Sequence, residues 1–416
     1  MQKVRILKVL AIMGIMLLLL PTNLMAERIP VAILRTNADG KTKTLTFTYA
    51  ERPKVFARRG QNGIHRLNKR MLGDKPERYK NFYIWDDQPT WLDMISPVEG
   101  NYVNNDKITT VKFDKSFSMA RPTSTSFWFW GLRKLKTIIG IENLNTSEVE
   151  DMAFMFSKCC SLTELDLSGF NTANVYSMLF MFGGCSQLKT LDISGFNTAN
   201  VHDMRGMFSG CSQLESIDVS GFNTANVENM SLMFEGCSQL KTIDVSGFNT
   251  ALVGELLVMC LQLGTIDVSG FNAANSSGIS CMFRGCHNLK SIDISSFNIG
   301  KIVSNVYDCN DNIWNEEEKR ERLHECVDDI FSGCFNLRTI NIGGNDFSIF
   351  TTYNADIPRD VFKSVGTIGE PCRLIVNQQF DQSVLGPKDD YGNGFYQWLN
   401  GYFTLDTARP ESETNY

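Results

Sequence analysis

The sequence predicts an α/β solenoid, in which short strands from successive repeats stack as a parallel sheet around one core. The evidence is a pair of residue series, one of aspartate and one of phenylalanine, that share a period of 26 residues with a single interval of 23. The series are Asp166, Asp192, Asp218, Asp244, Asp267 and Asp293, and Phe170, Phe196, Phe222, Phe248, Phe271 and Phe297. Self-similarity at this period is typical of proteins whose repeats shield each other's apolar faces.

Each repeat predicts one strand followed by one helical turn. In the repeat that spans residues 188–211, Leu191 and Ile193 stand two positions apart, which is the alternation of a strand and directs Asp192 outward. Val201, Met204 and Met207 follow at intervals of three, which favours one face of a short helix or 3₁₀ turn. A strand plus a helical turn in about 26 residues is the plan of a leucine-rich-repeat solenoid.

Weaker copies extend the repeats to about ten rungs. They lie at residues 108–113, 337–342 and 373–376, so we expect a solenoid over 108–344 with an insertion at about 306–327. Open ends expose core, and terminal caps are therefore required. We expect a β-rich N-terminal cap over 27–107, a last degenerate repeat and C-terminal cap over 345–405, and a tail over 406–416.

The first 26 residues have the three parts of a secretory signal peptide. Lys3, Arg5 and Lys8 precede an apolar run over residues 9–20, and Ala26 offers a small residue for cleavage. The run is shorter than the ~20 residues that span a bilayer, and no other stretch is apolar enough. We therefore expect an exported protein without a membrane span, located at the cell surface or secreted, with the periplasm as the alternative.

Composition and charge exclude several classes. With 43% apolar and 21% charged residues, the chain is typical of globular proteins rather than disordered ones. Residues 27–107 carry 15 Lys/Arg against 10 Asp/Glu, whereas residues 108–416 carry 22 against 36, a net charge of −14. An acidic body of this kind argues against nucleic acid as a partner.

The consensus Met-Phe-x-Gly-Cys-Ser-x-Leu-x-x-Leu-Asp-Leu-Ser-x-Phe-Asn-Thr resembles the 26-residue repeat of BspA-like leucine-rich-repeat surface proteins of bacteria. Residues 140–149 are similar to that family's entry into its repeats, and residues 365–403 to its C-terminal end. The resemblance implies adhesion to host or bacterial partners from the cell surface. The resemblance implies no catalytic residues, because the members of that family share none.

The aspartate series is the first candidate binding surface. Strand alternation places Asp192 between Thr190 and Ser194 on one exposed face, so the sheet presents an acidic column between two columns of mostly hydroxyl side chains. Like charges about 4.8 Å apart repel by roughly 0.9 kcal/mol even in water. The sequence leaves open whether hydroxyl hydrogen bonds, partial protonation, Ca²⁺, or a basic or glycan ligand offsets this repulsion.

Differences between repeats supply further candidates on the helical side. Matching slots there hold Tyr176, His202 and Glu228, with Arg205 close by.

We expect no enzymatic activity, cofactor or metal site, because the four histidines do not cluster and nucleophile-elbow and phosphate-loop motifs are absent. The expected partners are extracellular proteins or glycans of the host or of other bacteria. A carbohydrate-capturing protein and a purely structural envelope protein are the alternatives, and the oligomeric state is left open.

Two more series are predicted to be structural. Seven cysteines recur at one slot and are expected to pack as buried free thiols: Cys159, Cys185, Cys211, Cys237, Cys260, Cys286 and Cys334. Cys309 and Cys326 flank the charged insertion and form the candidate disulfide. The asparagine after each repeat phenylalanine, such as Asn171 or Asn197, is expected to be buried and to bond backbone groups of adjacent rungs.

Overall fold

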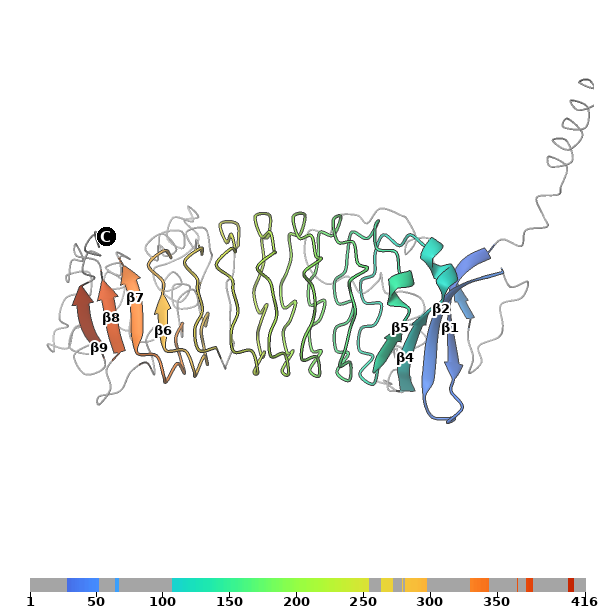
Figure 1. Ribbon diagram of the computed structural model, residues 1–416, viewed down its shortest axis with the longest axis horizontal. Coiled ribbons are helices and arrows are strands. Elements are labelled where there is room, and N and C mark those ends of the chain that lie inside the picture. Colours follow the sequence, from blue (N-terminus) through green and yellow to red (C-terminus); the bar gives the residue numbers. More distant parts are fainter. Residues whose placement is uncertain are drawn as a thin grey trace, which may run out of the picture.

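The protein is a rod of stacked coils, one coil per repeat (Figure 1). The computed structural model describes residues 28–51, 64–66, 107–253, 263–271, 279, 281–297, 330–343, 365, 372–376 and 403–407. The expected signal peptide, the insertion and most of the expected C-terminal cap lie outside these residues. One continuous cluster of buried apolar side chains, from Ala32 to Leu374, runs along the described coils.

A five-stranded sheet forms the N-terminal end of the rod, in the order β3-β1-β2-β4-β5. The strands are β1 (Arg28–Thr36), β2 (Lys43–Glu51), β3 (Ile64–Arg66), β4 (Ile108–Phe113) and β5 (Thr137–Ile139). β1 pairs antiparallel with β2 and β3, while β2 pairs parallel with β4, which pairs parallel with β5. The β1–β2 hairpin thus covers the first edge of the parallel stack, and its Phe47 stacks on Phe113 and Trp128.

A four-stranded parallel sheet forms the other end, in the order β6-β7-β8-β9 (Figure 1). Its strands are β6 (Ser291–Asp293), β7 (Thr339–Gly343), β8 (Cys372–Val376) and β9 (Phe403–Thr407). β8 contains the expected degenerate repeat at residues 373–376. β9 ends at Thr407 and pairs with β8 along its length, so the expected start of a tail at residue 406 is wrong.

The parallel sheet is interrupted between these ends. Leu191 and Ile193 are buried and Asp192 is exposed, as strand alternation predicts. Yet in the described stretch 162–246, the extended segments of neighbouring coils share one backbone hydrogen bond, from the Glu215 N–H to the Lys189 carbonyl at 3.0 Å. An isolated bridge between Asp244 and Asp267 resumes the pairing. The expectation of one continuous sheet is therefore wrong for the central coils.

The coils are joined instead on their opposite side, which we call the turn side: residues 152–162, 178–188, 204–214 and 230–240. Alternate N–H groups there donate to the following coil, for example Phe156 to Met181 and Phe182 to Met207 at 2.8 and 2.9 Å. The intervening N–H groups close turns within the coil, as Cys185 does onto Phe182. The turn side thus satisfies its backbone groups both along the chain and across the coils.

The helical turn expected on this side is replaced by consecutive turns. Within the described residues the only helices are the short 3₁₀ helices η5 (Lys115–Met119) and η6 (Ile141–Asn143), and no helix there is long and apolar enough to cross a membrane. Glycines in the left-handed region, such as Gly184 and Gly210 at φ of 76° and 71°, interrupt any helix. The spacing of three fits the turns as well as it fits a 3₁₀ helix, because both close i to i+3 hydrogen bonds.

Buried threonines and aromatic rings complete the contact between coils. The Thr198 hydroxyl accepts from the Asn223 N–H at 2.8 Å and donates to the Asn223 carbonyl at 3.0 Å, and Thr146, Thr172 and Thr224 do the same one or two coils away. Inside the rod, Phe156, Phe182, Phe208 and Phe234 stack with ring centroids 5.5–5.7 Å apart.

The asparagine expected to make this contact does not. Asn171, Asn197 and Asn223 are exposed, and each side-chain oxygen accepts from the N–H two residues later in its own coil. The threonine that follows is buried in its place, since the chain turns a corner here and strand alternation no longer decides which side chain faces inward.

Candidate functional site

The candidate surface predicted from the aspartate series is exposed and regular. We call it the Asp face; it comprises the outward side of segments 163–168, 189–194, 215–220 and 241–246, together with Asp267 and Asp293. Each carboxylate accepts the backbone N–H two residues later at 2.9–3.0 Å. In three coils the serine hydroxyl at the same position also donates, as Ser194 does to Asp192 at 2.7 Å.

These hydrogen bonds favour the charged form of four of these carboxylates. The serine hydroxyl and then the serine N–H lower the pKa of Asp192, while repulsion from Asp166 and Asp218 has a smaller, opposite effect. The pKa values of Asp166, Asp218 and Asp267 are lowered by the same kind of bond. Of the explanations left open by the sequence, hydroxyl hydrogen bonding is therefore the one that the structure supports.

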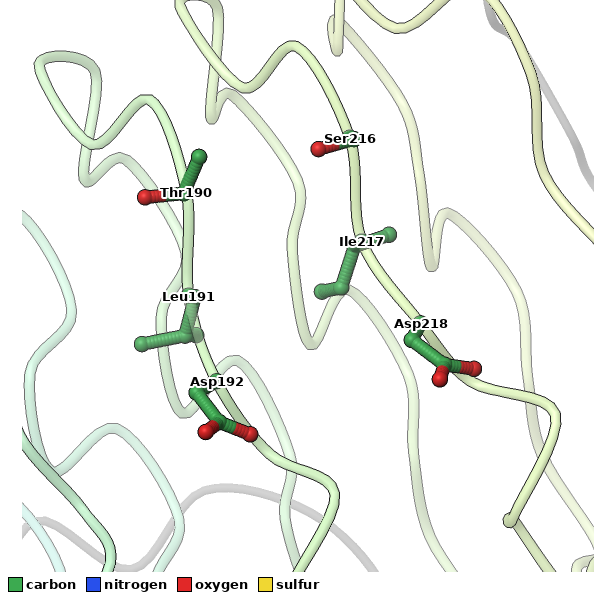
Figure 2. A pocket seen from close by; sticks show the side chains of 6 residues that line it. All are labelled: Thr190, Leu191, Asp192, Ser216, Ile217 and Asp218. Atoms are coloured by element: carbon green, nitrogen blue, oxygen red, sulfur yellow. The ribbon is translucent and has the colours of Figure 1, made fainter.

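An open groove of about 360 Å³ lies on this face between two central coils. Its lining comprises Thr190, Leu191 and Asp192 from one coil and Ser216, Ile217 and Asp218 from the next (Figure 2). Figure 2 shows the two extended segments side by side, with hydroxyl and carboxylate groups at equivalent positions on each. The groove coincides with the gap in the sheet, where only Glu215 bonds Lys189.

The arrangement suits contact with a large ligand better than chemistry on a small one. Equivalent groups repeat from coil to coil, whereas a small-molecule site brings unlike groups to one point. Within the described ranges, no group of three or more His, Cys, Asp or Glu side chains is placed to hold a metal ion.

The candidates that differ between repeats form a second surface, just before the turn side in each coil. Tyr176, His202 and Glu228 lie in adjacent coils, since the His202 N–H donates to the Tyr176 carbonyl and the Glu228 N–H to the His202 carbonyl, both at 2.8 Å. His202 Nδ1 lies 3.3 Å from Glu228 Oε1, and both side chains are exposed. Arg205 pairs with Asp203 in its own coil at 3.4 Å and is mostly buried. The structure thus joins three of the four predicted residues in one column, in which Tyr176 is half-buried and the other two are exposed.

Two partly buried carboxylates beside this column were not predicted. Asp151 and Asp203 occupy the slot that holds Ser177 and Asn229 in the other coils, and parallel bridges join the series. Burial raises the pKa of Asp151 to about 6, against the hydrogen bond from the Ala153 N–H. Burial also raises the pKa of Asp203, against its hydrogen bonds from Arg205. The sequence does contain a signal for these residues, because the equivalent position carries a small polar side chain in each of these coils.

The cysteine series is confirmed as buried thiols without disulfide bonds wherever it is described. Cys159, Cys185, Cys211, Cys237, Cys286 and Cys334 are buried, and none of them is disulfide-bonded. Several thiols donate to the carbonyl of a phenylalanine in the preceding coil, as Cys211 does to Phe182 at 3.2 Å. Burial raises the pKa of Cys211 to about 12. Cys260 and the candidate pair Cys309 and Cys326 lie outside the described residues.

Comparison with known proteins relates the central repeats to one family. A family described as Mycoplasma protein of unknown function, DUF285, matches in three overlapping segments, at residues 123–242, 180–262 and 210–323. The chain is similar to that family. The matches cover only part of the chain and bring no activity with them. A search of curated protein sequences finds no match.

Among solved structures, a leucine rich cell surface protein from Faecalibacterium prausnitzii A2-165 is similar at 15% sequence identity. The similarity covers 76% of this chain and 87% of that one, with a TM-score of 0.26. A TM-score this low gives no basis for superposing the two folds.

Proposed function

We propose that this is an exported, non-enzymatic surface protein of the BspA-like type that adheres to extracellular proteins or glycans of a host or of other bacteria. Binding takes place along the repeated outer surfaces of the rod, where each coil contributes a weak contact and many contacts together give affinity. The signal-peptide pattern of residues 1–26 and the resemblance of the repeats support the location.

The observation that carries this proposal is the Asp face. Its carboxylates are exposed, and each accepts a hydrogen bond from the N–H of the serine two residues later. The serine bonds to Asp192 also lower the pKa of that carboxylate. The coils are joined on the turn side, so these side chains are available for contact without loosening the rod. A partner that crosses several coils meets the same groups at each coil, which suits long and repetitive ligands.

The column of Tyr176, His202 and Glu228 supplies the complementary element. These three side chains differ from coil to coil, whereas the Asp face repeats nearly unchanged. Different side chains on a regular backbone can give binding specificity, because their arrangement fits one partner better than another. We assign general adhesion to the Asp face and partner choice to this column.

The test is binding by the mature chain, residues 27–416, to immobilised matrix proteins, a glycan array and whole bacterial cells. One variant combines Asp192→Asn, Asp218→Asn and Asp244→Asn; a second combines Tyr176→Ala, His202→Ala and Glu228→Ala. We expect the first variant to weaken all binding at least tenfold and the second to remove only some partners.

The matched control is Asn197→Ser with Asn223→Ser, which alters an exposed polar column at the corners of the same coils. Binding to glycans alone would support the carbohydrate-capturing alternative instead. Binding to no surface, together with normal adherence of cells that lack the protein, would overturn the proposal and leave a structural envelope role.

A further inference from the structure

One column of the rod changes character between its central and C-terminal coils. In the central coils the residue after each buried cysteine is a serine, and its hydroxyl donates to the preceding coil, as Ser212 and Ser238 do at 3.4 and 3.2 Å. Near the C-terminal end the same slot holds His287 and then Phe335. Two aromatic rings thus replace a row of small hydroxyl groups.

Phe335 is exposed and rigidly held. It is 58% exposed, and among the large apolar side chains that are exposed in the described residues it is the only aromatic one. Its ring stacks on His287 with centroids 5.4 Å apart and planes 10° from parallel. Because His287 covers one face, the exposed area lies on the opposite face and the outer edge of the ring.

Hydrogen bonds fix this pair in place. His287 Nδ1–H donates to the Gly333 carbonyl at 2.7 Å, and Asn336 Nδ2 donates to the His287 carbonyl at 2.7 Å. A ring that is already ordered loses little conformational entropy when a ligand packs on it.

A row of three cations, one from each of three successive coils, lies near the ring. Lys290 and Arg338 occupy one slot, and the Arg338 N–H donates to the Lys290 carbonyl at 2.8 Å. Arg373 of the next coil is in register with Thr339, and its N–H donates to the Arg338 carbonyl at 2.7 Å. Arg338 Nη1 also donates to the Phe335 carbonyl at 2.8 Å, which places the row next to the ring. In the central coils the same slot is mixed, with Glu215 between Lys189 and Lys241.

The acidic column is interrupted at the same place. Asn341 stands where an aspartate is expected, and its amide donates to Asp293 at 2.7 Å. The coils of β7 and β8 therefore carry Arg338 and Arg373 without an aspartate in this column, which resumes at Asp406 of β9. They form a local cationic patch on a body whose residues 108–416 carry a net charge of −14. Charge complementarity favours an anionic partner here and a different one along the Asp face.

We propose that Phe335, Lys290, Arg338 and Arg373 form a binding subsite for an acidic glycan. A pyranose ring packs its apolar C–H face on the exposed face of Phe335, and its carboxylate or sulfate group pairs with the cations. This subsite rests on the proposed adhesive function and names one partner class for it. A single exposed ring offers too little apolar area to enter a bilayer.

The experiment measures binding of the mature chain to heparin and hyaluronan oligosaccharides, with neutral dextran, phosphatidylserine vesicles and single-stranded DNA as comparison probes. We expect binding to one or both acidic glycans that weakens as salt rises. Phe335→Ser, which installs the residue of the central coils, is expected to reduce binding at least tenfold, and Phe335→Trp to retain it. Arg338→Gln and Lys290→Gln are each expected to cost about threefold, while the matched control Lys189→Gln changes nothing.

Unchanged affinity of Phe335→Ser for acidic glycans would overturn the subsite, as would stronger binding to the vesicles or the DNA than to either glycan. Adhesion to cells or matrix proteins without acidic-glycan binding would overturn the subsite alone and leave the proposed function standing. Binding to none of the probes and to no surface would contradict both.

Discussion

The turn side and the Asp face of the rod are built from the same repeats, yet they are joined in different ways. On the turn side, alternate backbone N–H groups donate to the next coil at 2.6–3.0 Å. On the Asp face of residues 162–246, one backbone hydrogen bond connects neighbouring extended segments. The cohesion of the central rod is therefore concentrated on one side, and the other side is available for binding.

This difference assigns separate tasks to the two sides. Substitutions that disturb the stacked phenylalanines or the buried threonines are expected to loosen several coils, because each repeat is stable only against its neighbours. Substitutions on the Asp face change exposed charge and leave the contacts between coils intact. The predictions below compare the two sides directly, beginning with the largest effect.

Phe182→Ala is expected to destabilise the rod most. The ring is fully buried and lies between Phe156 and Phe208, each 5.7 Å away. Removing a buried aromatic ring leaves a cavity and costs about 3–5 kcal/mol. Urea denaturation followed by circular dichroism measures the loss. Asp192→Asn is the control on the Asp face. Equal destabilisation by both variants would contradict the claim that the Asp face contributes little to the stability of the rod.

Thr198→Val tests the threonine contact with little change of shape. The buried hydroxyl both accepts from and donates to Asn223, so valine leaves a buried N–H and a carbonyl without that partner. A cost of about 2 kcal/mol follows from unsatisfied buried groups. Thr190→Val makes the same change on the exposed Asp face and is expected to leave the free energy of unfolding unchanged within error. An equal cost at both positions would contradict the assignment.

Asp151→Asn is expected to stabilise the protein near neutral pH. Burial raises the folded-state pKa of Asp151 from 3.8 to about 6. Its contribution to stability is therefore greatest below pH 3.8 and is lost as pH rises through 6. Asparagine keeps the acceptor for the Ala153 N–H, as Asn229 does for Ser231, and removes the charge, for a gain of about 1.5 kcal/mol at pH 7.5.

Thermal unfolding at pH 4.5 and 7.5 measures this effect, which is expected to shrink at the lower pH. Asn229→Asp is the reciprocal variant and is expected to destabilise at pH 7.5. A stabilisation by Asp151→Asn that is the same at both pH values would show that the buried charge is not its cause.

The sequence predicted the features that depend on periodicity. The 26-residue period, the outward direction of Asp192, the buried cysteines and the strand at residues 373–376 all follow from spacing and alternation. Strand alternation holds wherever a segment is extended, whether or not it pairs with its neighbour. For the same reason, the pattern could not reveal that the central segments are largely unpaired.

The features that the sequence missed depend on local backbone geometry. A spacing of three fits both a 3₁₀ helix and a series of turns, and the left-handed residues decide between them. At the corner after Phe196, either Asn197 or Thr198 could face inward, and only the path of the chain makes Thr198 the buried one. Asp151 escaped notice because its slot has no acidic periodicity, and its raised pKa comes from burial.

Native-state hydrogen exchange tests the central claim most directly, because it measures each backbone hydrogen bond in the intact rod. The amides of Phe156, Phe182 and Phe208 donate to the next coil and are expected to exchange slowly. The amides of Leu191, Asp192 and Ile217 on the Asp face are expected to exchange orders of magnitude faster. Equal protection of the two groups would mean that a continuous sheet joins the coils on the Asp face, and would contradict this account.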